Sequence, residues 1–152
     1  MVDGCRGFQV VEEYQKQNVI IPQRKTANSA GYDIASAVDV DLPPHKVTLV
    51  PTGLKAYMQP HEYLGLYVRS SLALQHQVCC INSVGVIDAD YYNNEANEGH
   101  IMVALINHDE EPVHITKGMR VAQGIFTPYL TVDGDEAGTG ASRQGGFGST
   151  GA

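Results

Sequence analysis

The chain has 152 residues, with 17 acidic and 10 basic side chains and a formal net charge of −7. This length suits one domain with a sizeable buried core. The acidic balance argues against binding to a nucleic-acid backbone, which needs a basic surface. No apolar run approaches the roughly 18 residues of a membrane span, and the N-terminus lacks the pattern of a secretory signal. We therefore expect a cytoplasmic protein that does not enter a membrane.

The cysteines and histidines do not have the spacing of a structural site. Cys5, Cys79 and Cys80 are odd in number and form no CxxC motif, which predicts buried thiols rather than a disulfide framework or a zinc site. The six histidines include no i, i+4 pair, so a transition metal held by the protein is not expected.

Short segments with β-strand character run through most of the chain. Val38–Leu42 alternates with a period of two, and other short runs are bounded by Pro, Gly, Asn or Asp. These other runs are Lys46–Val50, Leu54–Met58, Tyr63–Val68, Val78–Ile81, His100–Asn107, Val113–Ile115 and Val121–Phe126. Only Ser70–Gln77 suits a helical turn or two. About ten short strands in one domain predict an all-β barrel or jelly-roll-like sandwich.

The composition changes near Val132 to Gly, Asp, Ser and Thr, which predicts a β-domain over 1–131 and a flexible C-terminal lid over 132–152. In the lid, Arg143 offers a planar fork of donors to phosphate, and Phe147 offers a flat face to a base. A flexible terminus that binds nothing is the alternative.

A second informative segment is Asn82–Tyr91. Its apolar residues flank Gly85, which predicts a tight hairpin whose backbone amides can contact a ligand. The carboxylate of Asp88 is a candidate general base for water, and a local hydrogen bond within a turn is the alternative role.

Three further segments bring polar side chains to strand ends: Ala30–Ile34, Val68–Ala73 and Arg120–Gln123. Each has a simple structural explanation. Arg69 suits a surface ion pair, Ser70 suits a helix cap, and Gln123 suits an outward-facing strand position.

Taken together and in order, these five segments resemble the five motifs of the homotrimeric dUTPase family, of bacterial or phage type, over about Ala30 to Gly151. The resemblance implies a distorted β jelly roll and a homotrimer with three active sites, each built from all three subunits. It also implies Mg²⁺-dependent hydrolysis of dUTP to dUMP and pyrophosphate. This reaction limits uracil in DNA and supplies dUMP for dTMP synthesis.

The resemblance also implies a role for each matching residue. Asp33 would hold Mg²⁺ through water, Asp88 would activate the water that attacks the α-phosphorus, and Tyr91 would pack under the deoxyribose and exclude a 2′-hydroxyl. The other implied substrate contacts are Arg69, Ser70, Ser71 and Gln123 at the phosphates, Asn82 with the backbone of Gly85, Val86 and Ile87 at uracil, and Arg143, Phe147, Gly148, Ser149 and Thr150 in the closing tail.

Two departures from the family pattern leave questions open. Arg143 lies four positions before Phe147, one fewer than is frequent, which leaves its contact with the terminal phosphate open. After Tyr91 the chain inserts residues 92–99, either as a simple surface loop or as a feature that binds a regulatory partner, whose identity the sequence does not give.

Two alternatives share the fold. One is a dCTP deaminase or a bifunctional deaminase, which uses a Glu and lacks the array Asp88-x-Asp90-Tyr91. The other is a non-catalytic regulator built on the same scaffold.

Overall fold

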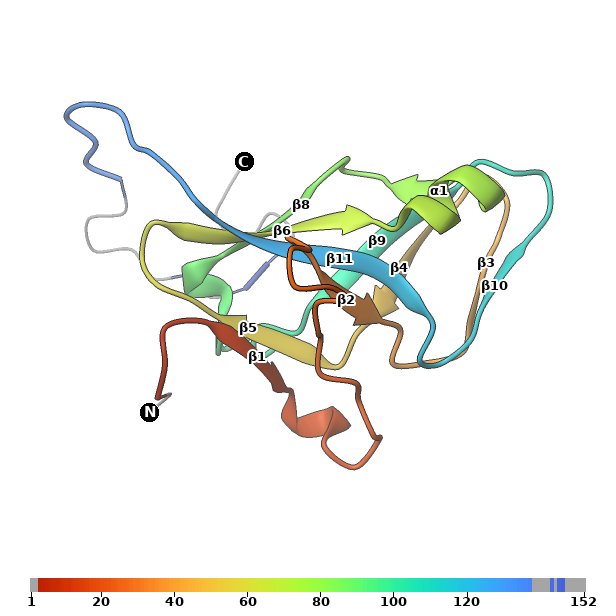
Figure 1. The fold of residues 1–152 in the computed structure, drawn as a ribbon, viewed down its shortest axis with the longest axis horizontal. Coiled ribbons are helices and arrows are strands. Elements are labelled where there is room, and N and C mark those ends of the chain that lie inside the picture. Colours follow the sequence, from red (N-terminus) through yellow and green to blue (C-terminus); the bar gives the residue numbers. More distant parts are fainter. Residues whose placement is uncertain (1–2, 138–142, 144, 147–152) are drawn as a thin grey trace.

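The computed structural model describes residues 3–137, 143, 145 and 146. These residues form eleven strands, one α-helix and two short 3₁₀ turns (Figure 1). The strands are β1 (Gly7–Val10), β2 (Tyr32–Ala35), β3 (Val40–Leu42), β4 (Val47–Pro51), β5 (Leu54–Tyr57), β6 (Glu62–Val68), β7 (Val78–Cys80), β8 (Gly85–Asp88), β9 (Met102–Asn107), β10 (Val113–Ile115) and β11 (Arg120–Pro128). The helix α1 spans Ser70–His76, and the 3₁₀ turns η1 and η2 span Glu12–Tyr14 and Ala89–Tyr91.

The strands form small antiparallel sheets that close around one core. The largest sheet has the order β2-β11-β6-β8, and a second sheet has the order β4-β9-β7. Two further pairs, β1-β5 and β10-β3, complete the walls. Figure 1 shows β9 and β4 behind the layer of β6 and β11, with β1 and β5 along one side. This all-β architecture with one short helix confirms the fold class expected from the sequence.

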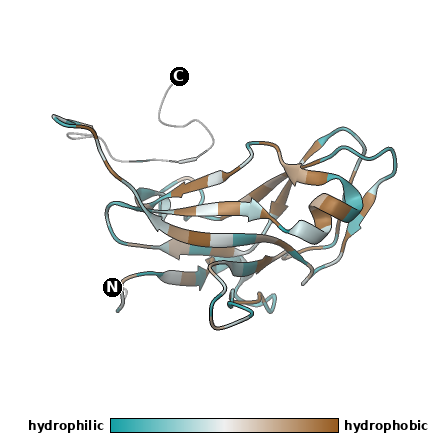
Figure 2. Ribbon diagram, turned by 45° about the horizontal axis from the view of Figure 1, so that its top comes forward, coloured by the Kyte–Doolittle hydropathy of each residue, from teal (hydrophilic) through white to brown (hydrophobic). Residues whose placement is uncertain are grey.

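The core is built by period-two alternation within the strands. Leu64 and Leu66 of β6 are buried, and the ladder partners of Leu64, which are Ile87 and Phe126, pack against the core. Tyr63 and Tyr67 alternate with these leucines and remain partly exposed. Figure 2 shows the same alternation as hydrophobic and hydrophilic bands along the strands. Each fully buried leucine stabilises the fold by about 1.5–3 kcal/mol, so this alternation fixes the register of the large sheet.

The strand positions match the sequence closely, with two exceptions. Each predicted run overlaps an observed strand, but β1 and β2 were not predicted as strands. The predicted hairpin around Gly85 is wrong. The chain turns earlier, at residues 81–84, and Gly85 begins β8. Because β7 pairs with β9 and β8 pairs with β6, this turn carries the chain from one sheet to the other.

The helix α1 begins without a side-chain cap. Arg69 occupies the cap position in an extended conformation, so the interpretation of Ser70 as a helix cap is wrong. The helix ends at Gln77, which takes a left-handed conformation with φ of 53°. Among the described residues, no helix is long and apolar enough to cross a bilayer.

The cysteines follow the prediction in part. All three are free thiols, and Cys80 is buried, but Cys5 is exposed. The prediction of a buried thiol is therefore wrong for Cys5.

His100 joins two parts of the fold through a neutral imidazole. Its Nε2 accepts a hydrogen bond from the backbone N–H of Gly53 at 2.9 Å, and its ring lies against Tyr14 with ring centroids 5.1 Å apart. Burial lowers the pKa of His100 below its ordinary value of 6.5, although the carboxylates of Glu13 and Glu98 oppose this shift. Protonation would also remove the acceptor that Gly53 uses.

We therefore expect stability to depend on pH through His100. Because its pKa is lowered on folding, the unfolded chain binds more protons just below pH 6.5, and the free energy of unfolding falls as the pH drops through this window. Melting temperatures measured between about pH 7.5 and about pH 5.5 should fall with pH. In His100→Gln the side-chain oxygen can still accept a hydrogen bond from the backbone N–H of Gly53, but it does not titrate. The decrease of the melting temperature with falling pH should therefore be smaller in this variant. An unchanged slope in the variant would contradict the assignment.

Candidate active site

The Asn82–Tyr91 segment lines a cavity of about 210 Å³ between the two larger sheets. The cavity is lined by Asn82, Gly85, Val86, Ile87, Asp88 and Tyr91, together with Leu66, Cys80, Met102, Val103, Ala104, Arg143 and Gly146. The described residues with a predicted role at uracil, at the sugar or as the general base thus line the same cavity. Phe147, predicted to cover uracil, lies outside the described residues. The apolar wall formed by Leu66, Cys80, Met102, Val103 and Ala104 was not predicted, because it comes from strands whose pattern indicates only core positions.

Asp88 lies at the end of β8, on the rim of this cavity, with its side chain 49% exposed. Its carboxylate accepts a hydrogen bond from Nη2 of Arg143 at 2.5 Å, while Nε of Arg143 donates to Asp90 at 2.8 Å. Asp88 also precedes η2, but its side chain makes no capping hydrogen bond there. The alternative role as a local turn residue is therefore wrong for this carboxylate.

Tyr91 forms part of the cavity wall and is 6% exposed. Its hydroxyl donates to the backbone carbonyl of His100 at 2.7 Å and accepts from Nδ2 of Asn97 at 2.9 Å. Burial raises the pKa of Tyr91, while the hydrogen bond from Asn97 and the charge of Arg143 act in the opposite direction. Gly146 lies so close to the ring that an added Cβ would stand 2.6 Å from Cε2 of Tyr91.

A second group of predicted residues gathers around Asp33 of β2. Asp33 lies directly across the ladder from Gln123 of β11. Its carboxylate is 3.1 Å from Nη1 of Arg120 and 3.8 Å from Nε of Arg69. Ser70 and Ser71 begin α1 immediately after Arg69. Two arginines beside one carboxylate, with an amide across the ladder and two hydroxyl residues next in the chain, form a group suited to binding phosphates and a hydrated cation.

Arg120 is the member of this group that the sequence analysis missed. Arg120 begins the Arg120–Gln123 segment and lies three residues before Gln123. In a regular strand this odd spacing places the two side chains on opposite faces of the sheet. In the structure the register of β11 against β2 shifts between Arg120 and Ala122, which marks a β-bulge. A bulge re-aims side chains, and here Arg120 contacts Asp33.

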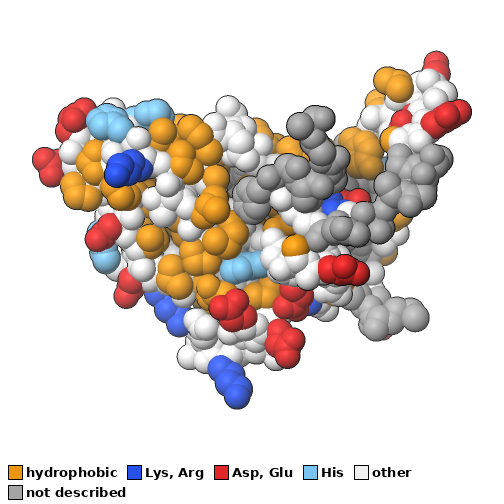
Figure 3. Space-filling model, turned by 180° about the vertical axis from the view of Figure 1, so that it is seen from behind, with side chains coloured by type: hydrophobic (Ala, Val, Ile, Leu, Met, Phe, Trp, Pro, Cys, Tyr) orange, Lys and Arg blue, Asp and Glu red, His pale blue; other side chains and the backbone are white. Residues whose placement is uncertain are grey.

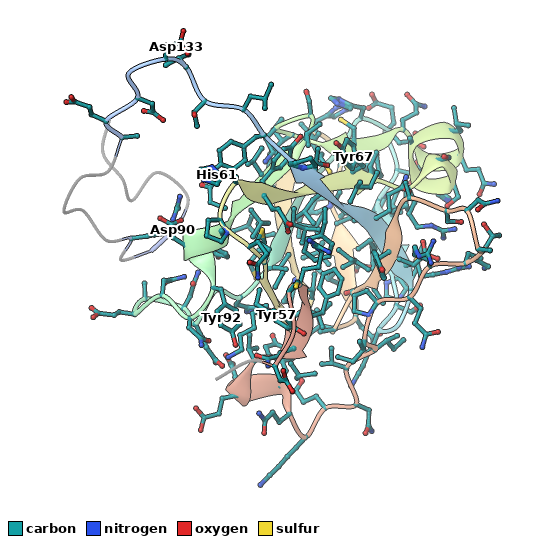
Figure 4. The ribbon with its side chains drawn as sticks, turned by 60° about the vertical axis from the view of Figure 1, so that its left-hand side comes forward. Tyr57, His61, Tyr67, Asp90, Tyr92 and Asp133 are labelled. Atoms are coloured by element: carbon teal, nitrogen blue, oxygen red, sulfur yellow. The ribbon has the colours of Figure 1, made fainter. Side chains whose placement is uncertain are left out.

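The two groups lie far apart within one chain. Asp88 pairs across the sheet with Tyr63 of β6, whereas the pair Asp33 and Gln123 lies on the rung of Tyr67. Four residues along β6 and three strand spacings across the sheet give a separation of roughly 20 Å. Figure 4 shows Tyr67 well apart from Asp90, which lies two residues after Asp88 in the chain.

The outer face of the β4-β9-β7 sheet is apolar and borders the cavity. Val47 and Leu49 of β4 are exposed, and they pair with Ile106 and Ala104 of β9. Ala104 and its strand neighbour Met102 also line the cavity. Figure 3 shows hydrophobic side chains gathered on this side of the molecule. Such a face is typical of a surface that another protein chain covers.

The predicted tail residues are described only in part. Arg143 contacts Asp88 and Asp90, as given above, and Gly146 packs against Tyr91. Phe147, Gly148, Ser149 and Thr150 lie outside the described residues, so their predicted roles stay predictions.

The chemistry around Asp33 suits magnesium held mainly by a substrate. In the part of the chain that the structure describes, no three His, Cys, Asp or Glu side chains are grouped as metal ligands. Magnesium keeps several waters and is often bound by one or two carboxylates together with phosphates. The carboxylate of Asp33 is already paired with Arg69 and Arg120, so it fits binding of Mg²⁺ through a water molecule better than direct coordination of the ion.

Comparison with known proteins gives a consistent result. The sequence model of the dUTPase family matches residues 17–151. The deoxyuridine 5′-triphosphate nucleotidohydrolase of Lactococcus lactis is 53% identical over 147 residues, which cover 97% of this chain and 98% of that protein. The crystal structure of dUTPase from Streptococcus mutans has a TM-score of 0.80 and 46% identity, covering 84% of this chain and 99% of that one.

A more distant structure shares the fold. A mutant dUTPase from phage phi11 of S. aureus, described with a coordinated structural Mg(II) ion, has a TM-score of 0.71 at 19% identity and covers 89% of this chain and 97% of that one. The chain therefore belongs to the dUTPase family, and it is a hydrolase of dUTP.

Proposed function

We propose that the protein hydrolyses dUTP to dUMP and pyrophosphate by attack of a water, activated by Asp88, on the α-phosphorus. The observation that carries this proposal is the half-exposed carboxylate of Asp88 on the rim of the cavity. A carboxylate in this position can take the proton of a water molecule while the substrate occupies the cavity beside it. Arg143, which binds this carboxylate, is a donor that the triphosphate can recruit on binding.

Uracil would be recognised by the backbone of β8 and by Asn82. Among the described strands β8 has one ladder partner, β6, so alternate backbone groups of β8 point away from the ladder. Gly85, Val86 and Ile87 lie on this edge and line the cavity. Amide and carbonyl groups that pair with uracil leave mismatched polar groups against cytosine, which can supply about 10⁴-fold discrimination.

The phosphates would lie against Arg69, Ser70, Ser71 and Gln123. With Mg²⁺ bound, Asp33 would hold it through water, and the ion would supply neutralisation of the charge that develops on the leaving pyrophosphate. The arginines supply the same kind of stabilisation through fixed, charged hydrogen-bond donors. The acidic net charge of the chain is compatible with this site because its cations are concentrated in one place.

We infer that the working enzyme is a homotrimer with shared sites. A nucleotide that touches Asp88 cannot also reach a group roughly 20 Å away in the same chain, so the phosphate group must come from another copy. The apolar face of β4-β9-β7 beside the cavity offers a surface for that copy. Leu130, two residues after β11 ends, is 98% exposed, which suits a segment that packs on a neighbour.

We propose residues 132–152 as a lid over the shared site. The contacts of Arg143 with Asp88 and of Gly146 with Tyr91 support this role, because both bring the tail to the cavity rim. Closure of such a segment excludes water and fixes the triphosphate for attack. The product dUMP would then serve dTMP synthesis, while removal of dUTP limits uracil in DNA.

The substrate assignment predicts a narrow specificity. Pyrophosphate release should be strong with dUTP and weak with dCTP, dTTP and UTP, and EDTA should reduce it because the phosphates lose their counter-ion. Ammonia release from dCTP, measured in parallel, should be absent if the protein is not a deaminase. Equal turnover of all four nucleotides would contradict the proposal.

The base assignment predicts the effect of Asp88→Asn. The amide keeps the shape but cannot take a proton, so kcat should fall by about 10²–10⁴-fold, with dUTP affinity nearly unchanged. Asp90→Asn is the matched control, because Asp90 also binds Arg143 but lies beyond the cavity rim. If the two variants lost activity equally, Asp88 would not be the base.

The shared site predicts complementation between inactive chains. Asp88→Asn and Arg69→Ala should each be inactive alone, but co-expressed mixtures should form intact sites from two different chains. Random assembly should restore about a quarter of the sites. A mixture of Asp88→Asn with Asp88→Ala is the control and should stay inactive. Failure of the first mixture to recover activity in assembled oligomers would show that each site belongs to one chain.

A further inference from the structure

The hydroxyl of Tyr91 is held by the inserted loop that follows it. Asn97 donates from Nδ2 to this hydroxyl at 2.9 Å, and the hydroxyl donates onward to the carbonyl of His100 at 2.7 Å. These two bonds fix the far end of a ring whose body lines the cavity. The loop over 92–99 is therefore tied directly to the candidate site.

The orientation of the Asn97 amide is set by its other contacts. Its Oδ1 accepts from Nδ2 of Asn94 at 2.7 Å and from the backbone N–H of Gly99 at 3.0 Å. With the oxygen engaged by two donors, the Nδ2 group must face Tyr91. Asn94, 6% exposed, also donates to the backbone carbonyl of Tyr91 at 2.8 Å. Asn94 and Asn97 thus both donate hydrogen bonds to Tyr91, which precedes them in the chain.

The outer side of the loop is anchored on β5. Nζ of Lys55 donates to Oδ1 of Asn93 at 2.7 Å and to Oε1 of Glu98 at 2.5 Å. Lys55 is 9% exposed, so these partners satisfy an ammonium that is almost buried. Oε2 of Glu98 accepts from the backbone N–H of Glu12 at 3.0 Å, which ties the loop to the N-terminal segment. Figure 4 shows Tyr92 of this loop beside Tyr57 of β5.

We propose that Asn97 is a positioning residue that fixes the plane of the Tyr91 ring and so sets the discrimination between deoxyribose and ribose. This inference rests on the proposed role of Tyr91 under the sugar. A ring can exclude a 2′-hydroxyl only if it does not yield when the larger sugar enters. The hydrogen bonds to both sides of the Tyr91 hydroxyl supply that resistance, and the 92–99 insertion is the element that provides one of them.

The test measures kcat and KM for dUTP and UTP in the wild-type enzyme, in the single variants Asn97→Ala, Tyr91→Phe and Tyr91→Ala, and in the double variant Asn97→Ala/Tyr91→Phe. Loss of one hydrogen bond should raise the UTP-to-dUTP ratio of kcat/KM by about 3- to 10-fold. Because Asn97 acts through the hydroxyl that Tyr91→Phe removes, the double variant should change the ratio no more than the larger single effect. Asn93→Gly is the matched control: it removes a side-chain hydrogen bond from the same loop, away from Tyr91, and glycine suits the φ of 56° there. This control can lower the melting temperature, but it should leave the ratio unchanged.

The outcomes separate the inference from the proposed function. If Asn97→Ala keeps the wild-type ratio while Tyr91→Ala raises it, the role of Tyr91 stands and the positioning role of Asn97 is wrong. Multiplying effects in the double variant, or a raised ratio in Asn93→Gly, would also overturn it. If Asn97→Ala does not fold, Tyr91→Phe decides, because an unchanged ratio there rules out any effect through the hydroxyl. A wild-type enzyme that hydrolyses dUTP without preferring it to UTP would remove the role of Tyr91 and the inference with it. A wild-type enzyme inactive on dUTP would overturn the proposed function itself.

Discussion

The register of β6 within the large sheet is the constraint on which the site depends. Leu64 and Leu66 must face the core, and this requirement leaves Tyr63 and Tyr67 on the outer face of the same strand. The rung of Tyr63 carries Asp88, and the rung of Tyr67 carries Gln123 and Asp33. A shift of the register of β6 by one residue would turn the faces that carry Asp88 and Asp33 toward the core. Burial of two leucines thus determines how far apart the two chemical groups lie and which way they face.

The charges of the site are balanced within the chain itself. Arg69 and Arg120 flank Asp33, and Arg143 bridges Asp88 and Asp90. Partly exposed pairs of this kind contribute little to stability, so their arginines can exchange a carboxylate for a phosphate at small cost. A chain with a net charge of −7 can therefore bind a polyanion, because local pairs rather than the total charge decide which groups meet the ligand.

Local patterns predicted much of the fold, and long-range pairing accounts for what they missed. Alternation and turn residues identified strands such as β10, Val113–Ile115, at their observed bounds. The Gly85 hairpin failed because the apolar residues on both sides of Gly85 suggested two paired arms, whereas Gly85 itself begins β8, which pairs with β6. Arg120 was missed because a β-bulge shifts the register, and Asn97 was missed because no periodic pattern marks a loop residue that contacts an earlier side chain.

The division of the site into two groups has a consequence for how selectivity arises. The cavity of Asp88 and Tyr91 is held by contacts within one chain, including the loop bonds through Asn97 and His100. The arginines around Asp33 belong to the other end of the sheet, which in a shared site is supplied by a different copy. Uracil and deoxyribose would then contact a cavity wall that one chain holds in place, while the triphosphate would contact residues of two chains. Small motions between subunits would change how the phosphates are held without loosening the groups that distinguish uracil and deoxyribose.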